Sequence, residues 1–314
     1  MSLDVLRQLC LERGFFLRRE ALGVGVDDSA LRRGLLAGTL VKLRHGAYGF
    51  KDLWDATPRL ARHLVLARAV VLTNHQQVAV SHTTGIVLHQ MESWRLPLGQ
   101  IHVTRLDRGA GRSTRDVVHH VGSIRDDDVV QVDGLVVTRP VRAALECATL
   151  VDVERALVVL DSGLRQELFT PLDLAEQAAL MDSWPGSLRL PVVTRLADGR
   201  SGSVGESRCR YVFWRCGVPA PQLQYEVYDE QGLAGICDFA WPEHKLLGEF
   251  DGRIKYGPLL REGETPSDAV FREKQREDRL RRATGFRVVR ITWDMLLAPL
   301  RTAAYVRSMM GIAA

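Results

Sequence analysis

The stretch that most constrains this chain combines the pattern of a β-strand with acidic side chains, which are rarely buried in a sheet. Residues 245–251 read Lys-Leu-Leu-Gly-Glu-Phe-Asp. Because side chains alternate along a strand, Glu249 and Asp251 share one face and lie about 7 Å apart at Cα. Asp238 lies in the preceding apolar stretch, and the short connection at residues 242–244 lets the two strands pair. We therefore expect Asp238 to lie beside Glu249.

Three carboxylates held this close need a partner of opposite charge. Ionised acids crowded in a low-dielectric environment repel one another, and a divalent cation removes that cost. Oxygen ligands suit Mg²⁺ or Mn²⁺, which can orient water and stabilise a phosphate under attack. The pattern predicts a metal site formed by Asp238, Glu249 and Asp251. The alternative is an exposed sheet edge on which these acids pair with nearby arginines.

The chain is long enough for more than one domain. A length of 314 residues exceeds one ordinary hydrophobic core and predicts two or three domains. A Gly- and Ser-rich loop at residues 197–203 marks the last boundary. We expect a helical unit at residues 1–50, a mixed α/β middle domain at 51–200 and a separate α/β domain at 201–314.

The composition excludes several classes of protein. Apolar residues make up 46% and charged residues 25%, which is ordinary for a globular domain, and the net charge of +4 permits nucleic-acid binding. No apolar run reaches the ~18 residues of a membrane span, and the N-terminus lacks a signal-peptide pattern. The five cysteines are scattered and odd in number, which disfavours a disulfide framework or a structural zinc site. We expect a cytoplasmic protein with no membrane partner.

Residues 1–50 carry the signals of three helices followed by a hairpin. Asp27 can cap the third helix, and the run at residues 40–48 fits two short strands around a glycine. This is the layout of a winged helix-turn-helix, in which Arg32 and Arg33 on the third helix would enter the DNA major groove. The alternative is a helical packing module whose arginines are simply solvated.

The middle region alternates helical and strand-like runs and carries no Gly-rich phosphate loop. His82 and His89 can share a helix face, but packed histidines explain them better than a metal site, because no acidic or thiol ligand accompanies them. His119 and His120 point to opposite faces of a strand. The expected helices cover residues 58–72, 142–148, 153–164 and 172–181, with one more starting near residue 78, and the expected strands cover residues 101–103, 117–120 and 135–138.

The last region is predicted to fold as helix, three strands, helix, strand and helix. Residues 271–290 hold eight basic and three acidic side chains, an excess of five positive charges. Such a helix beside a carboxylate cluster can neutralise a DNA backbone, and we expect Arg276 and Arg279 to contact phosphates. The expected elements are a helix at 206–216, strands at 222–227, 235–239 and 245–251, a helix at 267–283, a strand at 286–291 and a helix beginning near residue 293.

Five short motifs follow one another in this region: Gly-Glu-Ser at 205–207, Cys-Asp-Phe at 237–239, Glu-Phe-Asp-Gly at 249–252, Glu-Lys-Gln-Arg-Glu-Asp at 273–278 and Gly-Phe-Arg-Val-Val-Arg at 285–290. Their order and spacing resemble the PD-(D/E)XK nuclease superfamily, in the branch similar to very-short-patch repair endonucleases. The resemblance covers roughly residues 203–296 and implies a restriction-endonuclease-like α/β fold. It further implies that Asp238 and Glu249 bind Mg²⁺ or Mn²⁺, and that Glu206 is an additional ligand.

One residue departs from the superfamily pattern. The motif lysine would stand two residues after Glu249, and this chain has Asp251 there. Lys255 or Lys274 would then have to supply the cation that stabilises the transition state, with Asp251 assisting at the metal or orienting the water. Without such a cation, the domain would bind metal or DNA without cutting it.

The front half resembles a second family. Residues 14–23, which contain Gly-Phe-Phe-Leu-Arg-Arg, and residues 40–48, which end in His-Gly-Ala-Tyr, are similar to the N-terminal winged helix of abortive-infection type IV antitoxins. Residues 80–84 and 136–143 are similar to segments that often follow it. This resemblance implies binding to operator DNA and a toxin protein as a partner.

Two functions follow from these patterns. The first is a Mg²⁺-dependent DNA endonuclease guided by its own winged helix. The second is a non-catalytic DNA-binding transcriptional regulator of the type IV antitoxin kind, with a degenerate nuclease domain. The missing lysine favours the regulator, whereas the three retained acids favour the enzyme. The oligomeric state stays open.

Overall fold

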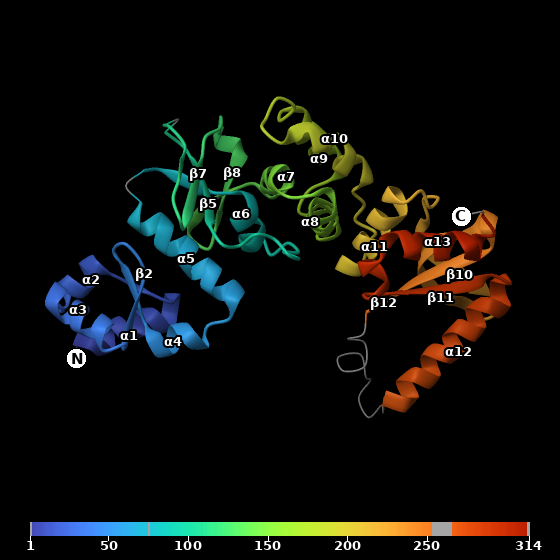
Figure 1. Cartoon of the computed structure of the whole chain (residues 1–314), viewed down its shortest axis with the longest axis horizontal. Coiled ribbons are helices and arrows are strands. Elements are labelled where there is room, and N and C mark those ends of the chain that lie inside the picture. The colour runs from blue at the N-terminus through green and yellow to red at the C-terminus, as the bar shows by residue number, and fades with distance from the viewer. Residues whose placement is uncertain (1, 75, 108, 253–265, 313–314) are drawn as a thin grey trace. The chain divides into compact units, whose positions relative to one another are not determined.

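The computed structural model describes residues 2–74, 76–107, 109–252 and 266–312 (Figure 1). The chain folds into two compact units. Unit 1 comprises Met1–Val151 and Leu172–Ser187, and unit 2 comprises Asp152–Pro171 and Leu188–Ala314. Both units combine helices with a β-sheet, which confirms the mixed α/β class. Within the described ranges, no helix is both long and apolar enough to cross a lipid bilayer.

The first part of unit 1 has the expected three helices and hairpin. Asp27 caps the third helix by accepting the Ala30 N–H at 2.8 Å. Leu6, Phe16 and Leu31 are buried where the helices meet the strands, which pair in the order β1-β3-β2. The elements are α1 (Ser2–Arg13), β1 (Phe16–Leu17), α2 (Arg18–Gly23), α3 (Asp28–Leu36), β2 (Leu40–Arg44) and β3 (Ala47–Phe50).

The rest of unit 1 is built around a six-stranded sheet of order β6-β7-β5-β4-β9-β8. The expected helix near residue 78 is wrong in its start: Val78–Val80 forms the central strand β4, because its valines are buried between β5 and β9. The elements are α4 (Lys51–Ala56), α5 (Arg59–Thr73), β4, α6 (His82–Leu88), β5 (Ile101–Arg105), β6 (Arg112–Ser113), β7 (Val117–His120), β8 (Val129–Val132), β9 (Leu135–Thr138), α7 (Pro140–Leu150) and α9 (Pro171–Ala179).

Glu146 of α7 is fully buried in unit 1, and both of its carboxylate oxygens accept hydrogen bonds. It accepts from Arg142 Nε at 2.9 Å and from Thr138 Oγ1 at 3.1 Å. The Arg142 guanidinium also reaches Asp128 at 2.7 Å and lies over the Trp184 ring at 5.1 Å. Burial raises the pKa of the Glu146 carboxyl, while Arg142 acts in the opposite direction. This cluster is a structural ion pair in the core.

Histidines extend this polar core. His82 stacks on His120 with ring centroids 3.6 Å apart and planes inclined by 15°, and His102 Nδ1 lies 2.8 Å from His120 Nε2. His89 Nε2 hydrogen-bonds the Thr138 carbonyl at 2.7 Å. His82 and His89, which were expected to pack, make a ring contact and a hydrogen bond, and His102 and His120 extend the cluster.

Unit 2 is a four-stranded sheet of order β10-β11-β12-β13, in which β10, β11 and β12 are antiparallel and β13 is parallel to β12 (Figure 1). Alternate residues of β12 separate the two faces. Leu246 and Phe250 pack in the cluster with α11 and α13, whereas Leu247 packs in the cluster that contains Leu280 of α12. The helices and strands that bear on the site are α11 (Val204–Arg215), β10 (Gln222–Asp229), β11 (Gly232–Trp241), β12 (Leu246–Asp251), α12 (Pro266–Thr284) and β13 (Arg287–Thr292).

Three further helices complete unit 2: α8 (Val153–Arg165), α10 (Leu190–Leu196) and α13 (Pro299–Met310). The elements expected between residues 206 and 291 are confirmed. The final helix begins at Pro299 rather than near residue 293, because Met295–Leu297 forms a separate 3₁₀ turn before a proline that starts the helix.

Candidate functional site at the β11–β12 junction

Asp238 lies where β11 and β12 stop pairing through their backbones. The antiparallel register runs from Trp241 opposite Leu246 to Phe239 opposite Gly248. Beyond that pair, the Asp238 carboxylate accepts the Phe250 backbone N–H at 2.7 Å. The side chain thus takes the place of a main-chain acceptor and holds the two strands at the point where they diverge.

Glu249 is the most buried of the predicted site acids, with 5% of its surface exposed. Its carboxylate forms an ion pair with Arg276 of α12 and lies 3.8 Å from Arg290 of β13. Arg290 in turn pairs with Glu277 of α12 at 2.7 Å. Two guanidinium groups therefore supply the positive charge that a buried carboxylate requires.

Two hydrogen-bond partners hold the guanidinium of Arg276 in place. Its Nη1 donates to the Ile236 carbonyl at 3.1 Å while Nη2 bonds Glu249. A Cβ at Gly235 would come within 3.3 Å of this Nη1, so the glycine leaves the space that the guanidinium occupies. With 31% of its side chain exposed, Arg276 remains open to solvent on one side. The helix thus delivers a fixed cation to the site.

The remaining described candidates of this cluster are Asp251 at a strand end and the exposed Lys274. Asp251 is the last residue of β12, half-buried and opposite Thr292 of the parallel strand. Lys274 is exposed on α12. Lys255, the other proposed source of the motif cation, lies outside the described residues. Two described basic side chains, Arg276 and Arg290, lie at Glu249.

Glu206 uses its carboxylate to cap its own helix. It accepts from the Gly202 N–H at 2.7 Å, from Ser203 Oγ at 2.8 Å and from Gln224 Nε2 at 3.1 Å. Ser203 is the N-cap residue, and its hydroxyl oxygen accepts the Glu206 N–H. These contacts give Glu206 a structural role that explains its burial.

The donor atoms of this region are chemically suited to Mg²⁺, but their arrangement is not. Asp238 and Glu249 offer hard oxygen ligands. In the described part of the chain, however, no group of three or more His, Cys, Asp or Glu side chains is placed to hold a metal ion. Arg276 already binds one oxygen of the Glu249 carboxylate and supplies a positive charge there. The site as folded does not fit a preformed metal cage.

The two arginines expected to reach DNA from α12 are both tied to acids of unit 2. Arg279 bonds Asp229 of β10 through Nε at 2.6 Å and Nη2 at 2.7 Å. This pairing holds the pKa of Asp229 at about 2. Other basic side chains of the region, including Lys274, Arg282 and Arg287, are exposed. Arg276 and Arg279 also keep 31% and 33% of their side chains exposed, so their contact with phosphates stays a prediction.

The arginines of α3 are placed differently. Arg32 and Arg33 are both exposed on the helix, and neither has an ion pair among the described residues. The neighbouring Arg18, by contrast, pairs with Asp28 at the start of the helix. The charges of Arg32 and Arg33 are thus available to an external anion.

Sequence reasoning missed Arg276 and Arg290 as partners of Glu249. One signal was present, because a parallel β12–β13 pairing places Arg290 next to Glu249 in register. For Arg276 no local signal existed, since its reach depends on how α12 crosses the sheet and on the space left at Gly235.

Comparisons with known proteins assign no activity. No known family profile matches the chain. Two relatives from Mycobacterium tuberculosis, "Uncharacterized protein MT2308" of strain CDC 1551 / Oshkosh and "Uncharacterized protein Rv2248" of strain ATCC 25618 / H37Rv, are each 32% identical over 121 residues. The match covers 38% of this chain and 45% of each relative, so the chain spans less than half the length of the relatives it matches. Function must therefore be argued from the side chains.

Proposed function

We propose that this chain is a DNA-binding protein in which α3 contacts the duplex and unit 2 is a nuclease-like domain. The observation that carries the proposal is that Arg32 and Arg33 are exposed on α3, a capped helix that directly precedes the β2–β3 hairpin in the chain. The order of elements from α1 to β3, with the sheet order β1-β3-β2, supports the assignment of a winged helix-turn-helix. Binding by the antitoxin-like front half to operator DNA is consistent with this layout, and a toxin partner remains a prediction.

The nuclease-like assignment of unit 2 rests on topology and on the position of two acids. The succession of α11, three antiparallel strands, α12 and a parallel strand is the order that the PD-(D/E)XK resemblance implies. Asp238 and Glu249 lie on neighbouring strands at the point where those strands diverge. This is where motif acids would be expected in such a domain.

The pairing of Glu249 with Arg276 favours the non-catalytic form of the proposal. The guanidinium of Arg276, which also donates to the Ile236 carbonyl, neutralises the Glu249 carboxylate without a metal ion. Metal-dependent cleavage of DNA is the second candidate, and the burial of an acid at this motif position favours it. The two candidates share DNA as the partner and differ in whether the phosphodiester bond is broken.

DNA binding is tested by titrating labelled duplexes with the full chain at several salt concentrations. Because each arginine contact to a base is worth about 1–3 kcal/mol, Arg32→Ala with Arg33→Ala should weaken binding more than tenfold and reduce the salt slope. Arg155→Ala, which removes a half-buried arginine outside α3 and α12, is the control. Equal DNA affinity of the double variant and the control would show that Arg32 and Arg33 do not contact DNA and that α3 only packs within its domain.

Cleavage is tested separately with Mg²⁺ or Mn²⁺ on varied DNA, including methylated and mismatched duplexes. If the chain cuts, Glu249→Ala should lower the rate by at least ~10²-fold, as the loss of one electrostatic stabiliser does. Duplex binding should persist, because removing a negative charge does not oppose phosphate approach. Tight binding without cleavage by the wild-type chain would establish the regulator and reject the enzyme.

A further inference from the structure

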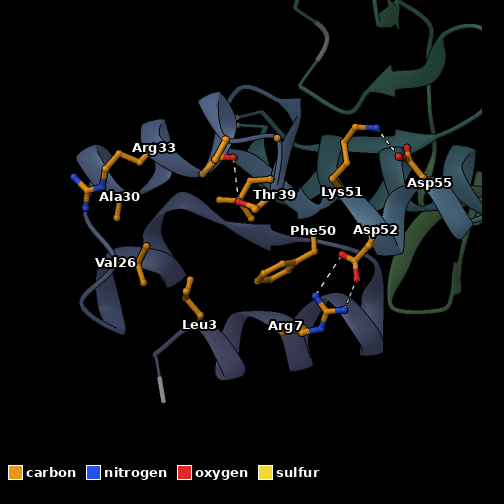
Figure 2. Close-up of a pocket in the computed structure, with 14 residues that line it drawn as sticks. Leu3, Arg7, Val26, Ala30, Arg33, Thr39, Phe50, Lys51, Asp52 and Asp55 are labelled. Atoms are coloured by element: carbon orange, nitrogen blue, oxygen red, sulfur yellow. Dashed lines mark hydrogen bonds and ion pairs between the residues drawn. The ribbon is translucent and has the colours of Figure 1, made fainter.

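A cavity of about 900 Å³ opens beside α3 in unit 1 (Figure 2). Its walls come from α1, α3, the β2–β3 hairpin and α4. Leu3, Val26 and Phe50 surround one open space, and Leu40 adds a further apolar side chain. Cavities of this size with an apolar lining and a few polar groups are typical of small-molecule sites.

The rim of this cavity carries an uneven set of charges. Arg7 pairs with Asp52, and Lys51 pairs with Asp55, so both acids on the rim are already neutralised (Figure 2). Arg33 also lines the cavity and has no ion pair among the residues that the structure describes. The rim therefore has one formal positive charge in excess. A ligand with an apolar body and a single negative charge complements both the lining and the rim.

One wall of the cavity is a face of the helix expected to read DNA. Ala30, Arg33, Gly34 and Ala37 of α3 and its C-cap contribute this wall, whereas Arg32 on the same helix does not line the cavity. An anion bound at the rim would engage the guanidinium of Arg33, which is one of the two charges available to a phosphate. Occupancy of the cavity and contact with DNA thus draw on the same side chain.

We propose that this cavity binds a small organic anion with an apolar body, and that its occupancy weakens DNA binding by competing for Arg33. The ligand site stands on the cavity and its charges alone, and only the coupling rests on the proposed DNA-binding function. Coupling of this kind is reciprocal, so DNA must weaken the ligand to the same extent that the ligand weakens DNA.

The site is tested with anilinonaphthalene sulfonate, an aromatic monoanion whose fluorescence rises in apolar surroundings, and with dodecanoate as a competitor. The full chain should bind one probe molecule saturably. Arg33→Ala should weaken the probe at least about tenfold, as loss of a charge-assisted contact does. Arg32→Ala is the matched control and should leave probe affinity within twofold. Ala37→Phe, at an exposed position on the cavity wall, should block the probe while circular dichroism confirms the fold.

Coupling is tested by adding dodecanoate to the duplex titration. Dodecanoate should weaken DNA binding by the wild-type chain and have no effect on Ala37→Phe. If the chain binds no DNA, the proposed function fails, and the probe titration still decides the ligand site. Equal probe affinity in Arg33→Ala, Arg32→Ala and wild type would overturn the site. Sedimentation showing a dimer that Ala37→Phe dissociates would also overturn it, since the cavity would then be covered by a second copy.

Discussion

Two buried glutamates, Glu146 of unit 1 and Glu249 of unit 2, meet the same physical requirement in different ways. Each is a carboxylate removed from water and balanced by arginine. Arg142, the partner of Glu146, is itself buried, with 2% of its surface exposed, and is shared with Asp128. Arg276, the partner of Glu249, keeps 31% of its side chain exposed. The first pair is buried in a core, whereas the second reaches solvent through its arginine.

The difference shows which buried charges can take part in function. A pair that is closed on all sides contributes specificity to packing and cannot exchange its partner without unfolding. A pair with one member at the surface can lose that member to an external cation or phosphate. Burial of the acid is nearly equal in the two cases, so exposure of the arginine distinguishes a structural site from a candidate functional one.

The largest expected difference between the surroundings of the two glutamates is a loss of stability of unit 1 at low pH. Burial lowers the pKa of His63 and His102 to about 4 and of His120 to about 3, below the ordinary 6.5. The unfolded chain therefore binds more protons than the folded chain below pH 6.5, and unit 1 loses stability as the pH falls towards 3. Each unit of lowered pKa corresponds to about 1.4 kcal/mol, so three such groups act strongly together.

Hydrogen exchange followed by mass spectrometry resolves the two units in this experiment. Between pH 6.5 and pH 4, protection should fall first in β4, β5 and β7, and later in β11 and β12. Loss of protection in unit 2 before unit 1 would contradict the assignment of the histidines as a neutral, buried cluster.

The next largest effect is expected at Arg142. Arg142→Ala leaves Glu146 and Asp128 buried without their shared guanidinium, and breaking a buried pair in this way costs about 3–5 kcal/mol of unfolding free energy. Urea unfolding with the same exchange readout measures the loss. Arg68→Ala, which breaks an exposed pair with Asp133, is the control and should cost less than about 1 kcal/mol.

A smaller loss is expected at Arg276. Arg276→Ala removes a hydrogen bond to a charged group, worth about 1.5–3 kcal/mol, while Arg290 stays within 3.8 Å of Glu249. Glu249→Gln in the same background should recover most of the stability, because the remaining side chain is neutral. A cost as large as that of Arg142→Ala would show that the two glutamates are equally locked and would remove the basis of the comparison.

The smallest effect is expected at Arg279, whose partner Asp229 keeps 21% of its side chain exposed. Arg279→Ala should lower the free energy of unfolding by less than about 1 kcal/mol, because solvent screens an ion pair near the surface. The pKa of Asp229 should rise from about 2 towards its ordinary value, since the Arg279 hydrogen bonds are its main cause. A carboxyl-detected NMR titration measures this shift. An unaltered titration would mean that Arg279 does not hold the acid in solution.

Local patterns were sufficient for most elements of the fold. The Asp27 cap and the hairpin at residues 40–48 lie in the structure where the sequence placed them, because each depends on neighbours in the chain. The same holds for the alternation in β12, which puts Leu247 and Phe250 on opposite faces. Val78–Val80 was misassigned, because a short apolar run fits a buried strand or a helix equally well until its partners are known.

The candidate site was predictable in its acids and not in its cations. Asp238 and Glu249 could be placed on adjacent strands from the length of the turn between them. The guanidinium of Arg276 reaches Glu249 across 27 positions of sequence, and no period or spacing encodes that contact.

The sequence by itself determined the strand that carries Glu249, the capped helix that carries Arg32 and Arg33, and the motif order of unit 2. These depend on the alternation of side chains and on the satisfaction of backbone groups within a few residues. Only the tertiary structure decided that Glu249 is balanced by Arg276 and that Arg33 borders a cavity. The reason is that a buried charge is satisfied by whichever opposite charge packing brings within reach, and packing joins residues that are distant in the chain.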